Sequence, residues 1–593
     1  MAKAESILDL IDVKFQDATN HVSFVSDDIM GLVMPYYWGE SDKVSVHNKT
    51  SFYEMYPESL PIGVKTLSNN DRDIYSGYAQ VKAYFAHGGG QVEVYRPTKG
   101  FKFQRIPLDA TASAVEFEQS DKQFDESAQM TIALKYAGFV PQSLASGFSN
   151  IAVGVRGKTI EGYDGDAMEI NVYGVGDFTA VSPAADANPS AEGWYELDND
   201  EYVETEDTTV DSEKTYYTQY ALLETFEGST NPLANISGES IYLEDVVKSE
   251  FIAVSVNGEV TVGTSLSVAE CALYNNEDGG NVKLDKDMVD GVKDACKYFR
   301  DFEVSNATLV INPFVKGDYT ITEGEGQSAT TITIDCQSGI DTELANLVEY
   351  RKNVMAVFGY PIDNSDYTAD AISAYFKDHV GKGYKFCVAL QGREIITLFG
   401  YRFTLNCVAG YCGKMINVAK EAHLNQIASG YIYGTYGGSL KESLLSGDVI
   451  DLMELGINSV YTSKRGNIIW GTRTMYNKQS SYFGKTNVMR VCSAILKNIY
   501  PIAVETLHTD AASNPITRAS LSTMLNSVLD TFIANQDLHA DSIADCSDSI
   551  NTDYLTKGGT VLNIILRLHF IGLVERVSIK IVATDTSVTA EFV

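Results

Sequence analysis

The sequence predicts a multidomain protein of mixed α+β and α/β structure, with a mainly β region inserted into α/β parts. Helix-like and strand-like patterns alternate between residues 284 and 400, which is typical of an α/β layer. Between residues 101 and 270 the runs are short, alternate in polarity and are rich in Thr, Ser and Gly, as in antiparallel β domains. A chain of 593 residues exceeds one ordinary core, so two to four domains are expected.

Charge and composition narrow the classes of function. The formal net charge of −34 argues against a groove that neutralises nucleic-acid phosphates, and it favours solubility over premature self-association. No stretch approaches the roughly 18 uninterrupted apolar residues of a membrane span, and the start of the chain does not resemble a signal peptide. We therefore expect synthesis in a cytosol and no direct membrane insertion. The eight cysteines show no pairing or zinc-finger spacing, which favours buried free thiols over metal ligands.

Residues 1–25 are predicted to form an amino-terminal arm. An alternating run there contains Val22 and Phe24, and alternation is typical of a strand. Further along, a glycine run at residues 88–90 ends a helical pattern and precedes a strand closed by Pro97. The elements expected in this part of the chain are strands at 29–33, 44–46 and 91–97 and a helix at 73–85.

The most acidic stretch runs from Asp186 to Glu227. It carries thirteen Asp and Glu residues against one Lys, a net charge of −12. Aromatic strand-like runs lie between the acids, so a small protruding β module is expected rather than a disordered segment. Two interpretations stay open: a solvated decoration, or an adhesive surface that uses Trp194 and the neighbouring tyrosines.

The layer from residue 284 to 400 is where an enzyme would have its site, because sheets of parallel strands often bind nucleotides at their strand ends. No catalytic constellation or phosphate cradle is recognised, however. The tripeptide at 484–486 ends like a P-loop but has Gln479 where the required glycine would stand. No cofactor, metal or catalytic residue is predicted. The expected elements are helices at 288–302, 343–352 and 368–380, and strands at 307–311, 354–358 and 384–388.

The sequence patterns that mark helix ends and apolar helix faces are clearest after residue 405. Gly456 is expected to take a left-handed conformation at a helix end, which returns Ile457 and Val460 to the core. Asn514 is predicted as an N-cap with Pro515 at the first helical position. The helix from 486 to 507 is expected to kink or split at Pro501. In the next helix an apolar stripe is predicted opposite Arg518, Ser522, Asn526 and Asp530, and it consists of Leu521, Met524, Leu525, Val528, Leu529 and Phe532.

The chain closes with alternating runs at 562–568, 577–581 and 587–593, which predict strands. A terminal strand can complete the sheet edge of a neighbouring molecule, because its backbone N–H and C=O groups are available for pairing. The alternate side chains Val588, Ala590 and Phe592 would then enter the partner's apolar face.

Together, four segments resemble the carboxy-terminal domain of contractile tail sheath proteins: Ile468–Thr474, Asn487–Val491, Asn514–Pro515 and Asp545–Asp553. The match covers residues 405–593, and residues 21–97 match the amino-terminal pattern of that family more loosely. The chain departs from the family where consecutive arginines often follow Asn-Val, since it has Met489 and Arg490, so a basic surface facing the tube is not implied. The family-motif core residues are Trp470, Gly471, Arg473, Asn487, Arg490, Asn514, Asn551 and Thr552.

The resemblance implies a structural subunit and no enzyme. Sheath subunits polymerise as stacked hexameric rings around a tail tube, exchange terminal strands, and contract without consuming nucleotide. The implied strand-exchange residues are Val22, Phe24, Val588, Ala590 and Phe592. The implied fold is an α/β carboxy-terminal sheath core with an inserted, mainly β outer domain. Its domains would be an arm at 1–25, a middle α/β domain at 26–100 with 271–404, a protruding β domain at 101–270, and the carboxy-terminal core at 405–593.

The same resemblance implies the partners and the setting. They would be other copies of the chain, a tail tube protein, and baseplate and tail terminator proteins, with no nucleic acid. The protein would be assembled in the host cytoplasm as part of a bacteriophage virion tail that ejects a genome through the host cell envelope. Alternatives left open are a virion adhesin or decoration protein and, further, the sheath of a phage-like secretion or bacteriocin machine.

Overall fold

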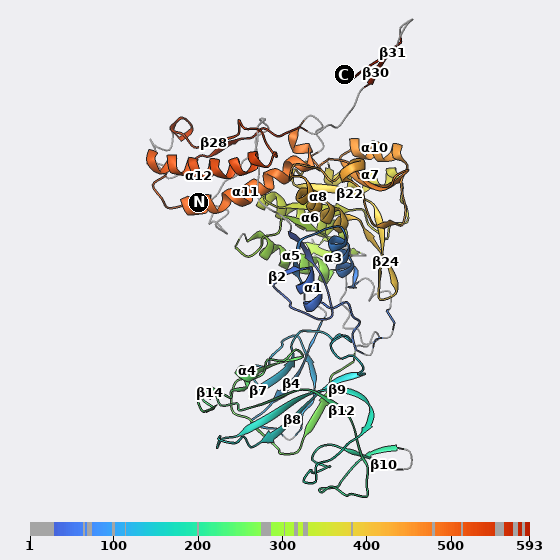
Figure 1. Ribbon diagram of the computed structural model, residues 1–593, viewed down its shortest axis with the longest axis vertical. Coiled ribbons are helices and arrows are strands. Elements are labelled where there is room, and N and C mark those ends of the chain that lie inside the picture. The colour runs from blue at the N-terminus through green and yellow to red at the C-terminus, as the bar shows by residue number, and fades with distance from the viewer. Residues whose placement is uncertain are drawn as a thin grey trace.

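A mixed eight-stranded sheet and an attached β domain make up most of the computed structural model, and two long helices pack at the end far from the β domain (Figure 1). The predicted fold class, a mixed α+β and α/β multidomain protein with an inserted β domain, is confirmed. The structure describes residues 29–62, 64, 66–67, 74–97, 101–112, 114–198, 201–273, 286–301, 303–312, 318–323, 330–380, 383–476, 481–511, 514–551, 562–572, 579–583 and 588–592.

The eight-stranded sheet has the strand order β2-β3-β1-β18-β21-β22-β26-β27. All neighbours from β3 to β26 are parallel, and the two edge strands β2 and β27 are antiparallel to theirs. β21 and β22 are buried along their whole length and apolar except for Gln391, as expected of parallel strands covered on both faces. The strands are β1 (Ile29–Val33), β2 (Val44–Asn48), β3 (Gln91–Tyr95), β18 (Leu309–Ile311), β21 (Met355–Gly359), β22 (Cys387–Gln391), β26 (Ile457–Ser463) and β27 (Gly466–Trp470).

The parallel arrangement predicted for the 284–400 layer is thereby confirmed. β26 and β27 join the same sheet from beyond residue 404, where the sequence suggested a domain boundary. The domain division stays a prediction, and its boundary at 404 falls between strands of one sheet.

Helices cover both faces of this sheet. The chain passes from β1 towards β3 on one side and from β18 towards β26 on the other, so right-handed crossovers place α3 on one face and α6, α7 and α10 on the opposite face. α8 packs against α3, and α5 packs against α6. The helices are α1 (Lys49–Met55), α3 (Ser76–Ala86), α5 (Lys286–Arg300), α6 (Cys336–Arg351), α7 (Ala369–Val380), α8 (Val408–Glu421), α9 (Gly430–Tyr433) and α10 (Ser446–Glu454).

The β domain is built from two antiparallel sheets that share a core. A six-stranded sheet, β11-β10-β12-β9-β8-β17, packs on the four-stranded sheet β15-β7-β4-β6, with Ile132, Leu134, Val153 and Val172 among the core residues. The predicted antiparallel character of residues 101–270 is confirmed. The strands are β4 (Phe103–Leu108), β6 (Glu118–Ser120), β7 (Met130–Leu134), β8 (Asn150–Lys158), β9 (Ala167–Ala180), β10 (Tyr195–Asp198), β11 (Glu201–Glu204), β12 (Tyr216–Gly228), β15 (Ile252–Val256) and β17 (Ser267–Glu270).

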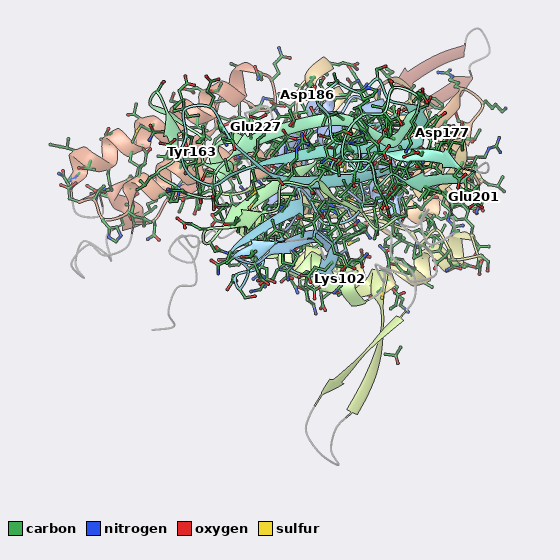
Figure 2. The ribbon with its side chains drawn as sticks, turned by 90° about the horizontal axis from the view of Figure 1, so that it is seen from below. Lys102, Tyr163, Asp177, Asp186, Glu201 and Glu227 are labelled. Atoms are coloured by element: carbon green, nitrogen blue, oxygen red, sulfur yellow. The ribbon has the colours of Figure 1, made fainter. Side chains whose placement is uncertain are left out.

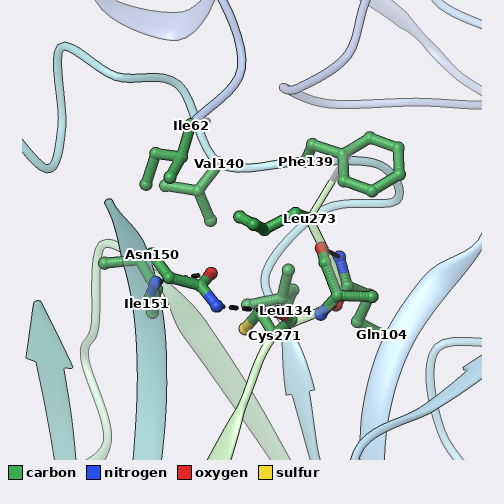
Figure 3. Close-up of a pocket in the computed structure, with 10 residues that line it drawn as sticks. Ile62, Gln104, Leu134, Phe139, Val140, Asn150, Ile151, Cys271 and Leu273 are labelled. Carbon is green, nitrogen blue, oxygen red and sulfur yellow. Dashed lines mark hydrogen bonds between the residues drawn. The ribbon is translucent and has the colours of Figure 1, made fainter. Parts of the chain in front are cut away.

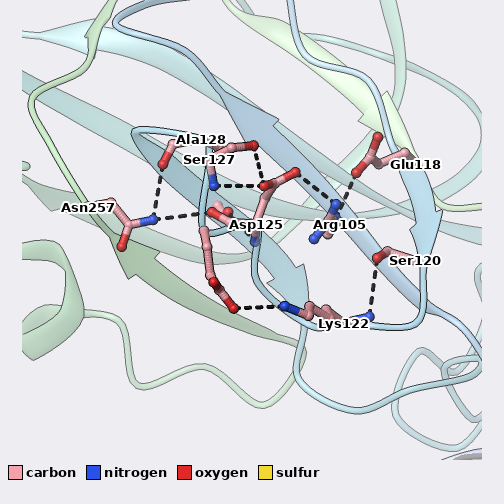
Figure 4. A network of polar contacts seen from close by, with 10 residues as sticks. Arg105, Glu118, Ser120, Lys122, Asp125, Ser127, Ala128 and Asn257 are labelled. Atoms are coloured by element: carbon pink, nitrogen blue, oxygen red, sulfur yellow. Dashed lines mark hydrogen bonds and ion pairs between the residues drawn. The ribbon is translucent and has the colours of Figure 1, made fainter.

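A polar network fixes one edge of the four-stranded sheet (Figure 4). Arg105 on β4 pairs with Glu118 on β6 at 2.7 Å and with Asp125 in the following loop at 2.8 Å. Hydrogen bonds from Ser127 are the largest cause that holds the pKa of Asp125 below its usual value. Asn257 donates to the carbonyl oxygens of Asp125 and Ala128, which ties this loop to the chain after β15.

The buried guanidinium of Arg96 joins the β domain to the eight-stranded sheet. It donates hydrogen bonds to the carbonyl oxygens of Tyr36 at 2.6 Å, Gly39 at 3.1 Å and Ala137 at 2.6 Å. Beside this joint a cavity of about 10 Å³ lies among Ile62, Phe139, Val140, Gln104 and Asn150 (Figure 3). A cavity of that size holds at most one water, so side chains fill the contact between the β domain and the eight-stranded sheet almost completely.

The carboxy-terminal part consists of α11 (Thr486–Thr506), α12 (Pro515–Ala534), the ribbon of β28 (Ile543–Asp545) and β29 (Ile565–Arg567), and the ribbon of β30 (Ile579–Ala583) and β31 (Val588–Phe592). α11 runs through Pro501 as one helix, so it does not split there, and the kink that was predicted as the other possibility stays a prediction. Pro501 is exposed, and water can therefore satisfy the carbonyl group that loses its helical partner.

α12 departs from the predicted pattern at two positions. Arg518 was expected on the solvent-facing side but is buried, where it donates to the carbonyl of Ala511 and pairs with Asp548. Met524 was expected in the core but is 45% exposed. The rest of the stripe is buried or half-buried, with Leu521, Leu525, Leu529 and Phe532 fully inside.

Candidate assembly site

The carboxy-terminal ribbon carries three of the five predicted strand-exchange residues. Val588, Ala590 and Phe592 lie on β31, which pairs antiparallel with β30. Within the described part of the chain, these two strands pair with no other strand, and the ribbon lies away from the helices (Figure 1). An isolated two-stranded ribbon is marginally stable in water. The other two residues, Val22 and Phe24, lie outside the described residues.

The family-motif residues at the end of β27 form one tightly packed group. Gly471 has φ +126°, and a β-carbon there would lie 2.4 Å from Oδ1 of Asn458. That same Oδ1 accepts the backbone N–H of Arg473 at 2.8 Å, while Nδ2 of Asn458 donates to the carbonyls of Ala389 and Arg473. Trp470 is half-buried and its ring contacts Tyr431 edge to face. This group joins β22, β26 and β27 to the segment that leads into α11.

A second group connects α11 to three other segments. Nδ2 of Asn487 donates to Oδ1 of Asn425 at 2.7 Å, and the backbone N–H of Asn425 donates to the buried carboxylate of Asp537 at 2.5 Å. Nδ2 of Asn425 donates further to the carbonyl of Ile571. One turn along α11, Arg490 donates to the carbonyl of Met415 on α8 at 2.7 Å. Residues 415, 425, 487 and 571 are therefore held together by buried polar contacts.

The remaining motif residues organise the segment around α12. Oδ1 of Asn514 caps the helix through the N–H of Ile516 at 3.0 Å, with Pro515 at its first position, so the predicted N-cap is confirmed. The buried amide of Asn551 donates to the carbonyls of Cys546, Ser547 and Asn563, and its Oδ1 accepts the N–H of Asn563 at 2.7 Å. Thr552 lies outside the described residues.

Sequence reasoning missed Asn458, Asn425 and Asp537 as members of these groups. The available signal was an asparagine between Ile457 and Val460, two positions predicted to face the core, because a buried amide needs partners. Their partners are remote in sequence, and only the tertiary structure reveals them. Gly456, by contrast, takes the predicted left-handed conformation at φ +90°, with Ile457 and Val460 buried.

The carboxyl ends of the parallel strands, where an enzyme would have its site, are filled by buried polar side chains. Asn312 follows β18 and donates to Oδ1 of Asp341 on α6 at 2.6 Å, and Tyr375 donates to its Oδ2 at 3.2 Å. Burial raises the pKa of Asp341 to about 8. Asp341 and Asn312 have no solvent-exposed surface, so a substrate has no access to them in this conformation.

The described residues also bear on metal binding and on membrane insertion. The ranges that the structure describes contain no group of three or more His, Cys, Asp and Glu side chains placed to hold a metal ion. Among the described helices, none is both long enough and apolar enough to cross a membrane.

Comparison with known proteins gives similarity at the level of structure alone. Neither a family model nor a curated protein matches the sequence. A sheath tail protein from Listeria innocua is 11% identical with a TM-score of 0.45, over 89% of this chain and 91% of that one. The contracted helical sheath of the anti-feeding prophage is 9% identical with a TM-score of 0.43, over 98% and 99%. A sheath tail protein from Desulfitobacterium hafniense is 10% identical with a TM-score of 0.41, over 90% and 92%.

Proposed function

We propose that this protein is the subunit of a contractile sheath, which polymerises around a rigid tube and contracts to drive that tube through a cell envelope. The work would come from a metastable extended polymer whose subunits gain contacts on rearranging, so no nucleotide or catalytic site is needed. Its partners would be further copies of the chain, a tube protein and the proteins that close the two ends of the sheath.

The carboxy-terminal ribbon is the observation that carries the proposal. β30 and β31 form a two-stranded sheet with unpaired outer edges in the described part of the chain, at a distance from the body. Such a ribbon gains stability when a strand of another molecule adds to its edge, because a row of backbone hydrogen bonds is then completed. A link of this kind can stay bonded while the rigid bodies rotate, as a contracting sheath requires.

Two settings agree with this proposal, a bacteriophage tail and a phage-like injection machine. In the first the tube delivers a genome from a virion, and in the second it delivers other cargo. Genome ejection by a virion tail is the function that we propose, since it is what the motif resemblance implied. Detection of the protein in purified particles that contain packaged DNA would support it, whereas its presence only in tailed particles without a capsid would indicate the injection machine.

Electron microscopy of the purified protein tests the sheath function directly. Concentrated protein in plain buffer should form rings or hollow striated tubes. Deletion of residues 587–593 should yield a folded subunit that forms neither, with its helical content and melting temperature nearly unchanged. The double substitution Thr589→Pro and Glu591→Pro should act in the same way without shortening the chain, because proline removes backbone N–H donors. Normal tubes from both variants would refute the strand link, and a strictly monomeric wild-type protein with a measurable turnover would refute the sheath function.

A further inference from the structure

The far end of the β domain has an aromatic surface, which we call the tip face. The register of β10, β11 and β12 places Tyr195, Leu197, Tyr202 and Tyr217 on one face of the sheet. Phe178, near the end of β9, joins them. Its ring centroid is 3.9 Å from that of Tyr202 in a stacked arrangement and 5.0 Å from that of Tyr195, and Tyr202 lies 5.1 Å from Tyr217.

The opposite face of the same strands is covered only in part, since Tyr216 there is buried and Val203 is 50% exposed. On that opposite face the loop from 206 to 215 folds back, and Lys214 pairs with Glu196 and Asp207. On the tip face Leu197 is 48% exposed and Tyr202 is 39% exposed. Exposed apolar surface concentrated at one end of a domain indicates an interaction site.

Carboxylates lie on the tip face and along its edges. Glu204, which lies opposite Tyr195 in the register, is on the tip face, whereas Glu201, opposite Asp198, points to the other face at the far end of the same edge strand β11; both are exposed. Asp177 precedes Phe178 and is also exposed; Figure 2 shows Asp177 and Glu201 at the same end of the domain. Lys214 is the single basic residue between 186 and 227, and it is paired on the opposite face. The local field at the tip face is therefore negative.

We propose that the tip face binds a cationic segment of another protein, one rich in arginine and lysine. Arginine guanidinium groups stack on aromatic rings and pair with carboxylates, and the tip face presents aromatic rings beside Glu204, with Glu201 at the edge of the same sheet. A second copy of the chain does not fit, because two acidic tips would repel each other. This binding role goes beyond the sheath function and does not depend on it, since it concerns the β domain alone.

Fluorescence anisotropy with the full-length protein tests the proposal. The probe is a labelled peptide of four Arg-Ser repeats, and the competitors are a peptide of four Glu-Ser repeats and the neutral sugar maltohexaose. The wild-type protein should bind the arginine probe at low salt. The double substitution Glu201→Gln and Glu204→Gln should raise Kd at least tenfold. Tyr202→Thr should raise Kd by a similar factor while the acids remain, because threonine keeps strand propensity but removes the ring.

The double substitution Glu239→Gln and Glu259→Gln is the matched control. Both residues are exposed in the same β domain but away from the tip face, and they carry the same charge change. If the control substitutions raised Kd for the arginine probe as much as the tip substitutions did, binding would reflect net charge only and the proposal would be overturned. Tighter binding of maltohexaose than of the arginine probe would also overturn it, and would identify a glycan surface instead. Circular dichroism of each variant separates lost binding from lost folding.

Discussion

The side-chain oxygen of Asn458 lies 2.4 Å from the position that a β-carbon on Gly471 would occupy. The same oxygen accepts the N–H of Arg473, so the amide cannot move aside without losing a buried hydrogen bond. Gly471 is also at φ +126°, which side-chain-bearing residues rarely adopt. Both its backbone conformation and its surroundings therefore require glycine at this motif position.

Gly471→Ala should lower the free energy of unfolding by about 3 kcal/mol or more, since strained backbone costs roughly 1–3 kcal/mol and overpacking adds a similar amount. Urea unfolding followed by circular dichroism measures the loss. The disturbance should reach Arg473 and the start of α11, because the carbonyl of Arg473 accepts hydrogen bonds from both Asn458 and the hydroxyl of Thr486.

Gly466→Ala separates the effect of backbone strain from the effect of crowding. Gly466 has φ +105°, but no atom lies within 4 Å of a β-carbon built on it, so only the backbone strain applies. This variant should lose about 1–2 kcal/mol. Equal losses in the two variants would show that crowding by Asn458 contributes nothing.

Local rules predicted the elements that depend on neighbours in sequence. The N-cap at Asn514 and the left-handed Gly456 follow from short-range backbone chemistry, and the buried parallel strands follow from apolar runs. Arg518 shows where such rules fail. Helical periodicity placed it in solvent, but the carbonyl of Ala511 and the carboxylate of Asp548 give its guanidinium partners inside. Those partners come from outside the helix, and helical spacing contains no information about them.

The Asn487–Asn425 hydrogen bond supports the packing of α11 against the rest of the carboxy-terminal part. Asn487→Ala should lower the free energy of unfolding by about 1–3 kcal/mol, because Oδ1 of Asn425 is then left buried without this donor. Thermal unfolding of the full-length protein measures the loss. Asn235→Ala is the control, since Asn235 is exposed and its amide donates to a nearby carbonyl. A loss no greater than that of the control would show that the buried pair is not a stabilising contact.

Asp341 should make the stability of the protein fall as the pH rises. Its folded-state pKa is about 8, above the ordinary 3.8, so the folded protein binds a proton that the unfolded chain releases between these values. The stabilisation is complete below about pH 4 and is lost as the pH rises through 8. One pKa unit corresponds to about 1.4 kcal/mol, so even part of this shift is measurable.

Asp341→Asn should remove this dependence, because the amide oxygen can still accept from Asn312, the amide nitrogen can donate to the hydroxyl oxygen of Tyr375, and no charge is buried. The variant should be at least as stable as wild type at pH 8, and the stability difference between pH 5 and pH 8 should shrink. Asp363→Asn, at an exposed loop position, is the control and should leave the wild-type profile unchanged. A larger loss of stability for Asp341→Asn at pH 8 than at pH 5 would contradict the assignment.

The tip of the β domain should be dispensable for polymerisation. Deleting the whole acidic stretch from Asp186 to Glu227 would damage the β domain, because the stretch includes most of β12. This strand pairs along β9 and contributes Leu223 and Phe226 to the packing around the domain core. Replacing residues 182–214 with a short Asn-Gly turn instead joins β9 to β12 directly and removes only β10, β11 and the loops around them. Two antiparallel neighbours connected by such a turn should form a hairpin.

In the proposed sheath, this shortened protein should still form tubes of normal diameter, because the far end of the β domain lies away from the eight-stranded sheet and the carboxy-terminal ribbon (Figure 1). Electron microscopy measures the tubes, and circular dichroism confirms that the β domain has kept its strands. The shortened protein should also no longer bind the arginine probe, which makes it a second test of the tip face. A folded variant that no longer polymerises would show instead that the tip is a contact between subunits.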